Sequence, residues 1–440
     1  MNPEFQRQLW LQFSPTRLLV LPLLLLACFA AIGLSGTDHI ATALGVTGAA
    51  LFGLLVWGMG TLAVGASVMD EITERTWDQQ RMSAMQPWAM TWGKLAGASA
   101  YGWYGGAFCL LVAVPASVLA GQSPALVLRL VLGGILGGLL LQALLIAVNL
   151  QLAKVGGRMA RRGGLSILLL TLLWGTGPLL GLLKDTDLLW WGQPFKGMSF
   201  SLASLALFVA CALGAAWRSM AEVLAVRQLP WGWPALALLL ASYIAGFAHE
   251  DRLLVFGISG LMTCTAFTYL ALLAEPQPRP LWQRVLTRLE NEQWRATLQQ
   301  LPRWPTTLAL ALPFAILVWY TLPQESPLAR EFSGFGGAFG SAGLHALVLV
   351  LLLLARDCAL ALFLSFSPKG RRPVLGFWVL MGVLYGLLPW LLSGLHSEML
   401  SGLVQPLLTP GIESVVFAAL HLALALGLLR WRWRWRATAT

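Results

Sequence analysis

The sequence predicts an all-α, polytopic integral membrane protein with about 12 transmembrane helices and both termini in the cytoplasm. Hydrophobic residues make up 58% of the 440 residues and charged residues only 11%, whereas a soluble domain carries about 25% charged residues. The mean hydropathy is +0.72. Because one helical span takes about 20 residues, a dozen spans leave room for short loops only. This composition excludes soluble globular, disordered and fibrous proteins.

Twelve apolar stretches of span length follow one another along the chain. They lie near residues 17–34, 40–69, 95–120, 125–153, 164–183, 199–217, 231–249, 253–274, 304–322, 341–364, 374–392 and 412–430. Within the fourth stretch, Gly133, Gly134, Gly137 and Gly138 form two small-xxx-small pairs. This spacing is typical of transmembrane helices that pack closely against a neighbour.

The distribution of cations fixes the predicted orientation. With the N-terminus inside, 24 of the 29 Lys and Arg residues fall on the cytoplasmic side and five outside. Such an excess on the inner side is what membrane insertion requires. The net charge of +10 is therefore attributed to topology, and no nucleic-acid partner is expected. We expect a multi-pass protein of a bacterial-type inner membrane, with the lipid bilayer as one partner.

Three segments outside the spans have the pattern of surface helices. Residues 1–13 place Phe5, Leu9 and Phe13 four residues apart, which predicts a helix lying in the membrane surface. The inward loop 275–303 has a basic amphipathic stretch and is interpreted as a connector. The C-terminal segment 430–436 alternates Arg and Trp and is interpreted as an interfacial stop signal.

A weak internal repeat suggests three regions. The segment that begins at Asn2 and continues to Pro15 is echoed by the one that begins at Asn291 and continues to Pro305. We therefore expect a six-span half at 1–227 and a two-span insertion with its connector at 228–290. A degenerate four-span unit with a basic tail is expected at 291–440. The five cysteines are odd in number and have no CxxC spacing, which predicts neither a disulfide framework nor a zinc site.

The inward loop after the second span is the most informative segment. On a helix, Glu71, Glu74, Arg75, Asp78 and Arg81 share one face, and Glu71–Arg75 and Asp78–Arg81 are pairs of opposite charge. The opposite face is too polar for lipid. A helix that is polar all round at a membrane surface is either solvated or pressed against another protein, and the charge pattern leaves both interpretations open.

The run Glu71-x-x-Glu74-Arg75-Thr76-x-Asp78, followed by Pro87 and Gly93-Lys94, resembles the first cytoplasmic loop of type-2 ABC transporter permeases. The N-terminal Asn2-Pro3-Glu4 and its amphipathic helix also resemble the connecting helix of that family. The resemblance is clearest over residues 1–120. It implies a short coupling helix, over residues 71–86, seated on a separate ATP-binding cassette subunit. The coupling residues would be Glu71, Glu74, Arg75, Trp77, Asp78, Arg81, Pro87, Gly93 and Lys94.

The resemblance implies the transmembrane permease subunit of an ATP-driven exporter, which is a transport subunit and not an enzyme by itself. No cofactor would be bound by this chain, and ATP and Mg²⁺ would lie on the partner subunit. The nearest glycine pattern, Gly60-x-x-x-x-Gly65-Ala66-Ser67, lacks the lysine of a phosphate-binding loop. The chain has about twice the six spans usual in the family. Either two half-permeases are fused here, or a second permease copy joins the complex.

A few polar residues lie inside predicted spans, where ionisable groups are functional candidates. Gln142 and Asn149 share one helix face, and either bond across helices or line a substrate path; the former is favoured. Arg356 and Asp357 are expected to pair with each other near the inner end of their span. Together these four form a possible intramembrane polar path.

Two other classes of function compete with an ABC permease. A stand-alone secondary transporter should show buried acids or broken helices at mid-membrane, and few mid-span charges are predicted. An intramembrane enzyme should show a clustered catalytic set, which the sequence does not indicate. External loops carry Asp38-His39, His249-Glu250-Asp251 and His396-x-Glu398. These loops could assemble a metal site, although solvated loop residues explain them better.

Overall fold

The computed structural model describes residues 2–35, 39–74, 82, 85–155, 186–226, 228–275, 277–321, 343–367, 373–393, 406 and 412–435. Within these ranges, 10 helices are long and apolar enough to cross a membrane, which confirms an all-α polytopic membrane protein. Of the 12 predicted spans, the one at 164–183 lies outside the described residues. The one at 231–249 is a shorter apolar helix, α11 (Gly232–Ala245).

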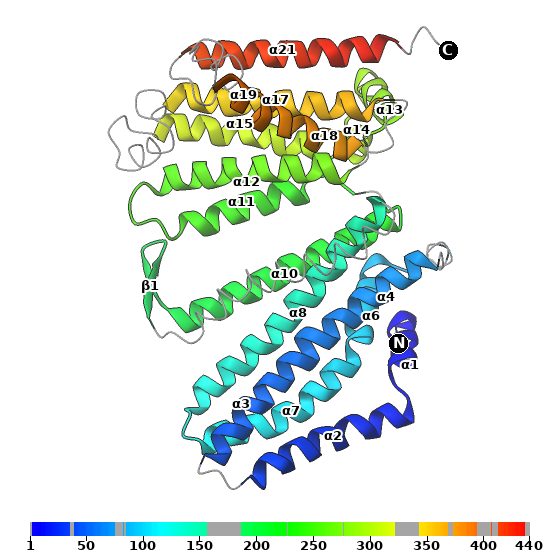
Figure 1. Cartoon of the computed structure of the whole chain (residues 1–440), viewed down its shortest axis with the longest axis vertical. Coiled ribbons are helices and arrows are strands. Elements are labelled where there is room, and N and C mark those ends of the chain that lie inside the picture. Colours follow the sequence, from blue (N-terminus) through cyan, green and yellow to red (C-terminus); the bar gives the residue numbers. More distant parts are fainter. Residues whose placement is uncertain are drawn as a thin grey trace. The chain divides into compact units, whose positions relative to one another are not determined.

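The chain divides into two compact units (Figure 1). The first comprises Met1–Leu188 and Gln193–Gln228, and the second comprises Leu189–Gly192 and Leu229–Thr440. The first unit thus ends one residue beyond the expected boundary at 227. The two helices expected as an insertion, α11 and α12, belong to the same unit as the helices that follow them.

The first unit is a bundle of long helices with one short helix at its N-terminus. Its elements are α1 (Pro3–Gln12), α2 (Pro15–Gly33), α3 (Ile40–Phe52), η1 (Gly53–Gly60), α4 (Thr61–Thr73), α6 (Pro87–Ala98), α7 (Ala100–Leu119), α8 (Pro124–Val155) and α10 (Gly197–Val223). The principal pairs are α8 with α10, α3 with α7, α4 with α8 and α1 with α6 (Figure 1). Val64, Met90, Ile146 and Met220 are fully buried where α4, α6, α8 and α10 meet.

The first helices begin where the sequence supplies caps. Asn2 accepts hydrogen bonds from the backbone N–H groups of Glu4 and Phe5, at 3.0 and 3.4 Å, and Pro3 follows it. Ser14 accepts from the N–H of Arg17 and is followed by Pro15. A side-chain acceptor satisfies N–H groups that have no partner within the helix, and proline at the first position lacks one.

The span predicted near 95–120 is found as α7, but the separate helix that precedes it was not expected. Helix α6 begins at Pro87, and the helical chain is interrupted at Ser99, so α6 and α7 are separate helices. The Ser99 hydroxyl donates to the carbonyl of Leu95 at 2.5 Å. The hydropathy of α6 is too low to mark it as part of a span, since it includes Lys94 and Trp92, and its start was therefore missed.

A π-helical segment, η1, lies between α3 and α4 and packs against glycines. A methyl group at Gly138 would lie 2.7 Å from Val56, and one at Gly137 would lie 2.9 Å from Trp57. The glycines of α8 therefore admit large side chains of η1. They confirm the predicted close packing. The glycines make room for side chains of η1, whereas we expected them to let two helix backbones approach each other.

The segment between the predicted spans 164–183 and 199–217 contains a β-hairpin, β1 (Asp187–Trp190) and β2 (Gln193–Lys196). Trp191 and Gly192, with φ of 52° and 76°, form its turn. Two consecutive residues with positive φ match the twist of a two-residue hairpin, and glycine adopts that conformation without strain. The length of the loop gave no indication of the hairpin.

The second unit also consists of helices. Its elements are α11, α12 (Arg252–Ala274), α13 (Arg279–Glu290), α14 (Trp294–Gln300), α15 (Trp304–Thr321), α17 (Gly343–Ser365), α18 (Pro373–Gly382), η2 (Val383–Leu387), α19 (Leu388–Ser393) and α21 (Ile412–Trp435). Helix α12 packs on α11 and α15, and α17 packs on α21 (Figure 1). The amphipathic connector predicted within 275–303 is α13, which buries Val285 and leaves Leu286 and Leu289 exposed.

Candidate functional site

The predicted coupling segment lies between the end of α4 and the start of α6. Arg75, Trp77, Asp78 and Arg81 lie outside the described residues. Glu74, just beyond α4, is exposed, and its N–H bonds to the carbonyl of Asp70 at 2.8 Å. The other members of the set, Glu71, Pro87, Gly93 and Lys94, lie on α4 and α6 at the two ends of the loop.

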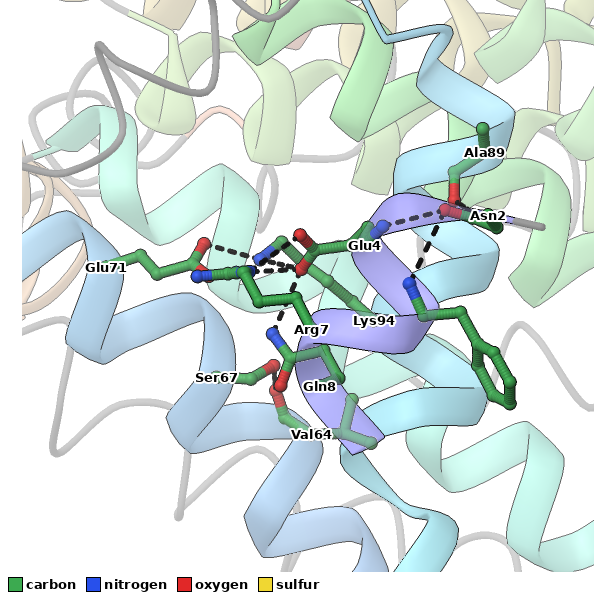
Figure 2. A network of polar contacts seen from close by, with 10 residues as sticks. Asn2, Glu4, Arg7, Gln8, Val64, Ser67, Glu71, Ala89 and Lys94 are labelled. Atoms are coloured by element: carbon green, nitrogen blue, oxygen red, sulfur yellow. Dashed lines mark hydrogen bonds and ion pairs between the residues drawn. The ribbon is translucent and has the colours of Figure 1, made fainter. Parts of the chain in front are cut away.

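Glu71 and Lys94 join two residues of α1 in a network that is buried except at Arg7. We call this network the ion clamp: Glu4, Arg7, Glu71 and Lys94 (Figure 2). The Lys94 ammonium lies 3.0 Å from Glu4 Oε1 and also contacts Glu71. Arg7 pairs with Glu4 through two nitrogens, at 2.9 and 3.0 Å, and reaches Glu71 as well. Two cations thus face two carboxylates, and each cation contacts both.

Helix α1 buries two polar side chains, leaves two apolar ones exposed, and holds Phe5 and Leu9 half-buried. Glu4 and Gln8 are each only 2% exposed, whereas Trp10 is 75% exposed and Leu11 is 64% exposed. Gln8 donates a hydrogen bond to Glu4 Oε1 at 2.9 Å. A helix with this arrangement can bury apolar side chains in the interfacial layer of a bilayer and still use its polar face to hold the protein. The predicted helix at 1–13 is confirmed.

Glycines on α6 allow α1 to approach. A methyl group at Gly93 would lie 2.8 Å from Cβ of Glu4, and one at Gly97 would lie 2.6 Å from Cβ of Gln8. Either contact is closer than real side chains accept, so α1 could not keep this position. The Asn2 amide adds a hydrogen bond to the carbonyl of Ala89 at 2.5 Å. The Gly93-Lys94 pair therefore has two roles, because Gly93 makes room for α1 and Lys94 holds it.

Two groups of the ion clamp are held in their charged forms. Burial by itself would raise the pKa of the Glu4 carboxyl. Hydrogen bonds from Arg7 and Gln8 and the charge of Lys94 outweigh burial, so the pKa of Glu4 lies below its usual value. The hydrogen bond to Glu4, followed by that to Glu71, raises the pKa of the Arg7 guanidinium. Both shifts favour the ion pair between Glu4 and Arg7.

Gln142 and Asn149 bond across helices. The Gln142 amide donates to the carbonyl of Val56 in η1 at 3.1 Å, and its oxygen accepts from the Trp103 indole at 3.2 Å. Asn149 donates to the carbonyl of Gly65 on α4 at 3.2 Å. Both side chains are buried. Their arrangement matches the alternative favoured from the sequence, in which they tie helices together.

Arg356 and Asp357 form a second buried charge cluster, in the second unit. Arg356 Nε donates to Asp357 Oδ1 at 2.8 Å. The hydroxyls of Tyr269 and Tyr385 donate to Asp357 Oδ2 at 2.7 and 2.9 Å. Arg356 lies 4.9 Å from the ring centroid of Tyr385 and contacts His421 on α21. We call these five residues the arginine–aspartate cluster.

The predicted pairing of Arg356 with Asp357 is confirmed, and its position near the inner end of the span stays a prediction. The two residues lie within the apolar stretch Leu347–Ser365 of α17. Arg356 is 4% exposed and Asp357 is 0% exposed. Hydroxyls from two other elements of the second unit satisfy the Asp357 carboxylate, as a buried charge requires.

The four residues of the first unit, Glu4 and Arg7 above all, were missed as a cluster from the sequence. The available signal was a lysine between Gly93 and Gly97, because a buried lysine in such a groove needs an acidic partner. Within the described residues, no three His, Cys, Asp or Glu side chains gather as a metal site. His396 and Glu398, which entered the predicted external site, lie outside that part of the chain.

Comparisons of the chain with protein-family models, with curated proteins and with solved structures gave no match.

Proposed function

We propose that the protein is the transmembrane permease subunit of an ATP-driven ABC exporter. It would lie in a bacterial-type inner membrane with both termini in the cytoplasm. ATP and Mg²⁺ would bind to a separate ATP-binding cassette subunit, and residues 71–86 would form the coupling helix that contacts it. Two features support this proposal: the family-like run from Glu71 to Lys94, and the way the ends of that run are held.

The observation that carries the proposal is that the ion clamp ties both ends of the loop to α1. Glu71 is near the end of α4, and Lys94 is on α6, the first helix after the loop. Both contact Glu4 or Arg7 of α1. A force applied to the loop by a partner therefore reaches three helices at once. A transport subunit needs rigid contacts of this kind, because the motion driven by ATP on a partner subunit must be transmitted to its membrane spans.

The first test is whether an ATP-binding subunit accompanies the protein. The tagged full-length chain would be extracted from native membranes in mild detergent, and the co-purifying proteins identified by mass spectrometry. We expect an ATP-binding cassette subunit in constant ratio to the chain, and ATP hydrolysis by the complex. A chain that purifies alone from native membranes and supports transport without ATP would overturn the proposal. Crosslinking in the same membranes distinguishes a fused permease from one that needs a second copy.

The second test reverses charge at the exposed end of α4. Glu74→Lys, combined with Asp78→Lys, should leave expression normal and weaken association with the ATPase, because a desolvated interfacial charge that loses its partner costs about 2–5 kcal/mol. Glu290→Lys, at an exposed position in α13, is the matched control and should change neither binding nor transport. Wild-type binding and transport in the double variant would reduce the segment to a solvated loop.

The arginine–aspartate cluster favours a second candidate, a stand-alone secondary transporter. Buried ionisable residues within spans are frequent in ion-coupled transport, and Asp357 is buried in a candidate span. The two candidates differ in their energy source. Transport by the chain alone in vesicles, driven by an ion gradient and abolished in Asp357→Asn, would select the secondary transporter. Transport that requires ATP and a partner subunit would select the exporter.

A further inference from the structure

Four candidate spans of the second unit, α12, α15, α17 and α21, have one end in common. Glu275, which follows α12, accepts a hydrogen bond from the N–H of Arg303, just before α15, at 2.9 Å and pairs with its guanidinium at 3.1 Å. The ring of Phe366, which follows α17, lies 5.7 Å from that of Trp433 near the end of α21. Because all four helices are long and apolar enough to cross a membrane, their common end lies at a membrane surface.

Helix α13 is fixed to that end through its first turn (Figure 1). The Arg279 guanidinium donates to the carbonyl of Trp433 at 2.8 Å and lies 5.2 Å from the centroid of the Trp433 ring. The ring of Trp282 lies 5.7 Å from that of Trp304, the first residue of α15. These contacts place α13 and the last turn of α21 side by side at the membrane surface.

The two segments carry an excess of positive charge. Residues 279–290 and 430–434 contain one acid, Glu290, and six arginines, which we call the arginine patch: Arg279, Arg284, Arg288, Arg430, Arg432 and Arg434. Glu290 ends α13, eleven residues or about 17 Å along the helix from Arg279. Arg430 and Arg434 are both exposed and, four residues apart, share one face of α21. The patch therefore attracts anions, and guanidinium groups suit phosphate oxygens in geometry as well as charge.

Exposed apolar side chains lie among these charges. Leu286 and Leu289 of α13 are 43% and 40% exposed, and Trp431 of α21 is 55% exposed. A soluble anion or a nucleic acid would leave these side chains in water. The headgroup layer of a bilayer accommodates both kinds of residue, because cationic side chains extend to the phosphates while leucine and indole side chains reach the acyl chains. The mixture favours a membrane surface over a soluble polyanion.

The length of α21 allows its arginines to lie at headgroup depth. Its 24 residues extend about 36 Å at 1.5 Å per residue, and the hydrocarbon layer of a bilayer is about 30 Å thick. The helix is thus longer than the layer by about one turn, and its C-terminal turn carries Arg432 and Arg434. The Arg432 guanidinium lies 4.8 Å from the ring centroid of Phe363 on α17, which anchors this turn to the bundle.

We propose that the arginine patch binds the headgroups of anionic phospholipids at the surface of the bilayer. Phosphate oxygens accept hydrogen bonds from Arg284, Arg430 and Arg434, and the exposed leucines of α13 contact the upper part of the acyl chains. The proposal does not depend on the exporter function, because it concerns how the second unit meets its membrane, whatever drives transport.

The experiment uses the full chain in phosphatidylcholine vesicles that contain a trace of phosphatidylglycerol with a photoactivatable group on its headgroup. After illumination, the labelled residues are located by mass spectrometry. We expect label concentrated on residues 279–290 and 430–434, displaced by unlabelled phosphatidylglycerol and not by further phosphatidylcholine. One basic residue near an anionic membrane changes binding about fivefold. Arg284→Gln and Arg434→Gln should each lower the label by that factor and their combination by about 25-fold, whereas lysine at both positions should retain most of it.

The matched control is Arg17→Gln, at an exposed arginine of α2 in the first unit. It removes the same charge and should leave the label on α13 and α21 unchanged. A second arm adds soluble glycerophosphoglycerol, which carries the same headgroup without acyl chains and should not displace the label. Displacement by this compound would overturn the proposal and assign the patch to a soluble phosphate ligand. Label spread evenly over the ends of all spans, or label that survives the double glutamine variant, would also overturn it.

Discussion

The ion clamp and the arginine–aspartate cluster both bury opposite charges, but they join helices in different ways. In the clamp the charges come from three helices, and Lys94 meets Glu4 across 90 residues of sequence. In the cluster the ion pair is between neighbours, and two neutral hydroxyls bring in the other helices. The helices around α1 are therefore held together by ion pairs. Those around α17 are held by hydrogen bonds to Asp357, whose charge is already neutralised by Arg356.

Exposure to water differs accordingly. The Arg7 side chain is 43% exposed, so one edge of the clamp meets solvent. Arg356 and Asp357 are at most 4% exposed and lie within a candidate span. The contacts of Arg7 can break at moderate cost, because water solvates the separated guanidinium. Lys94 and Glu4, which are 0% and 2% exposed, have no such alternative, and neither has the cluster. The edge of the clamp at Arg7 can therefore rearrange, while the core of the clamp and the whole cluster hold their helices fixed.

The largest effect that would test this difference is expected for Asp357→Asn. The change keeps the size of the side chain and removes its charge, which leaves Arg356 uncompensated. A guanidinium cannot lose its proton in a protein, so breaking this buried pair should cost about 3–5 kcal/mol. Thermal unfolding of the purified protein, followed by near-ultraviolet circular dichroism, measures the loss.

The control for Asp357→Asn is the double variant Arg356→Gln with Asp357→Asn. It removes both charges and leaves polar groups of similar size, so it should be more stable than the single variant. A single variant as stable as the wild type would show that water reaches the cluster, and the contrast with the clamp would fail.

The second largest effect is expected for Lys94→Met in the clamp. The ammonium is lost, and Glu4 and Glu71 then share only Arg7. The cost should be near the lower end for a broken buried pair, about 3 kcal/mol, because the carboxylates can take up protons. Hydrogen exchange should accelerate in α1 and remain slow in α3 and α7. Lys94→Met with Glu71→Gln restores the charge balance and should recover part of the protection.

The two clusters also show what the sequence could and could not predict. The spans could be predicted because burial in lipid requires long apolar runs. The Arg356–Asp357 pair could be predicted because its two residues are adjacent in the sequence. Glu71 was assigned by helix spacing to Arg75, yet it contacts Arg7, which is 64 residues away. Which of several charges meets Glu71 depends on how α1 packs, and local spacing carries no information about that.

The interruption at Ser99 and the hairpin at 187–196 were missed for a related reason. Hydropathy measures the tendency to enter the membrane, and it does not distinguish a continuous helix from two consecutive ones. Gly93 and Gly97 are four residues apart, a spacing that suits close packing against another helix. That their partner is the short surface helix α1, and not another span, follows from contacts with Glu4 and Gln8 that only the folded chain shows.

A smaller effect is expected from acid. Because the pKa of Glu4 is lowered in the folded protein, its charge stabilises the clamp fully above the ordinary carboxyl pKa of about 4.3. This contribution falls as the pH drops through the ordinary value and is lost below the lowered one. A spin label at Trp10, in a cysteine-free background, should become more mobile over that range. Glu4→Gln should remove the transition, and an unchanged profile in this variant would assign the transition to another group.

The smallest effects compare a hydrogen bond of the cluster, made by Tyr385, with the exposed ion pairs of the clamp, made by Arg7. Tyr385→Phe removes one of two hydroxyls from Asp357 and keeps the ring beneath Arg356, so the loss should be about 1 kcal/mol. Arg7→Gln removes the exposed cation of the clamp and should cost about as little, since partly exposed ion pairs contribute about 0–1 kcal/mol.

The dependence of stability on salt concentration distinguishes the two variants. Raising the ionic strength screens exposed charges, so the destabilisation by Arg7→Gln should shrink while that by Tyr385→Phe stays constant. Thermal midpoints of the two variants and the wild type at low and high salt measure this. If both differences shrink together, the cluster is open to solvent ions, and the helices around α17 are then held by charge just as α1 is.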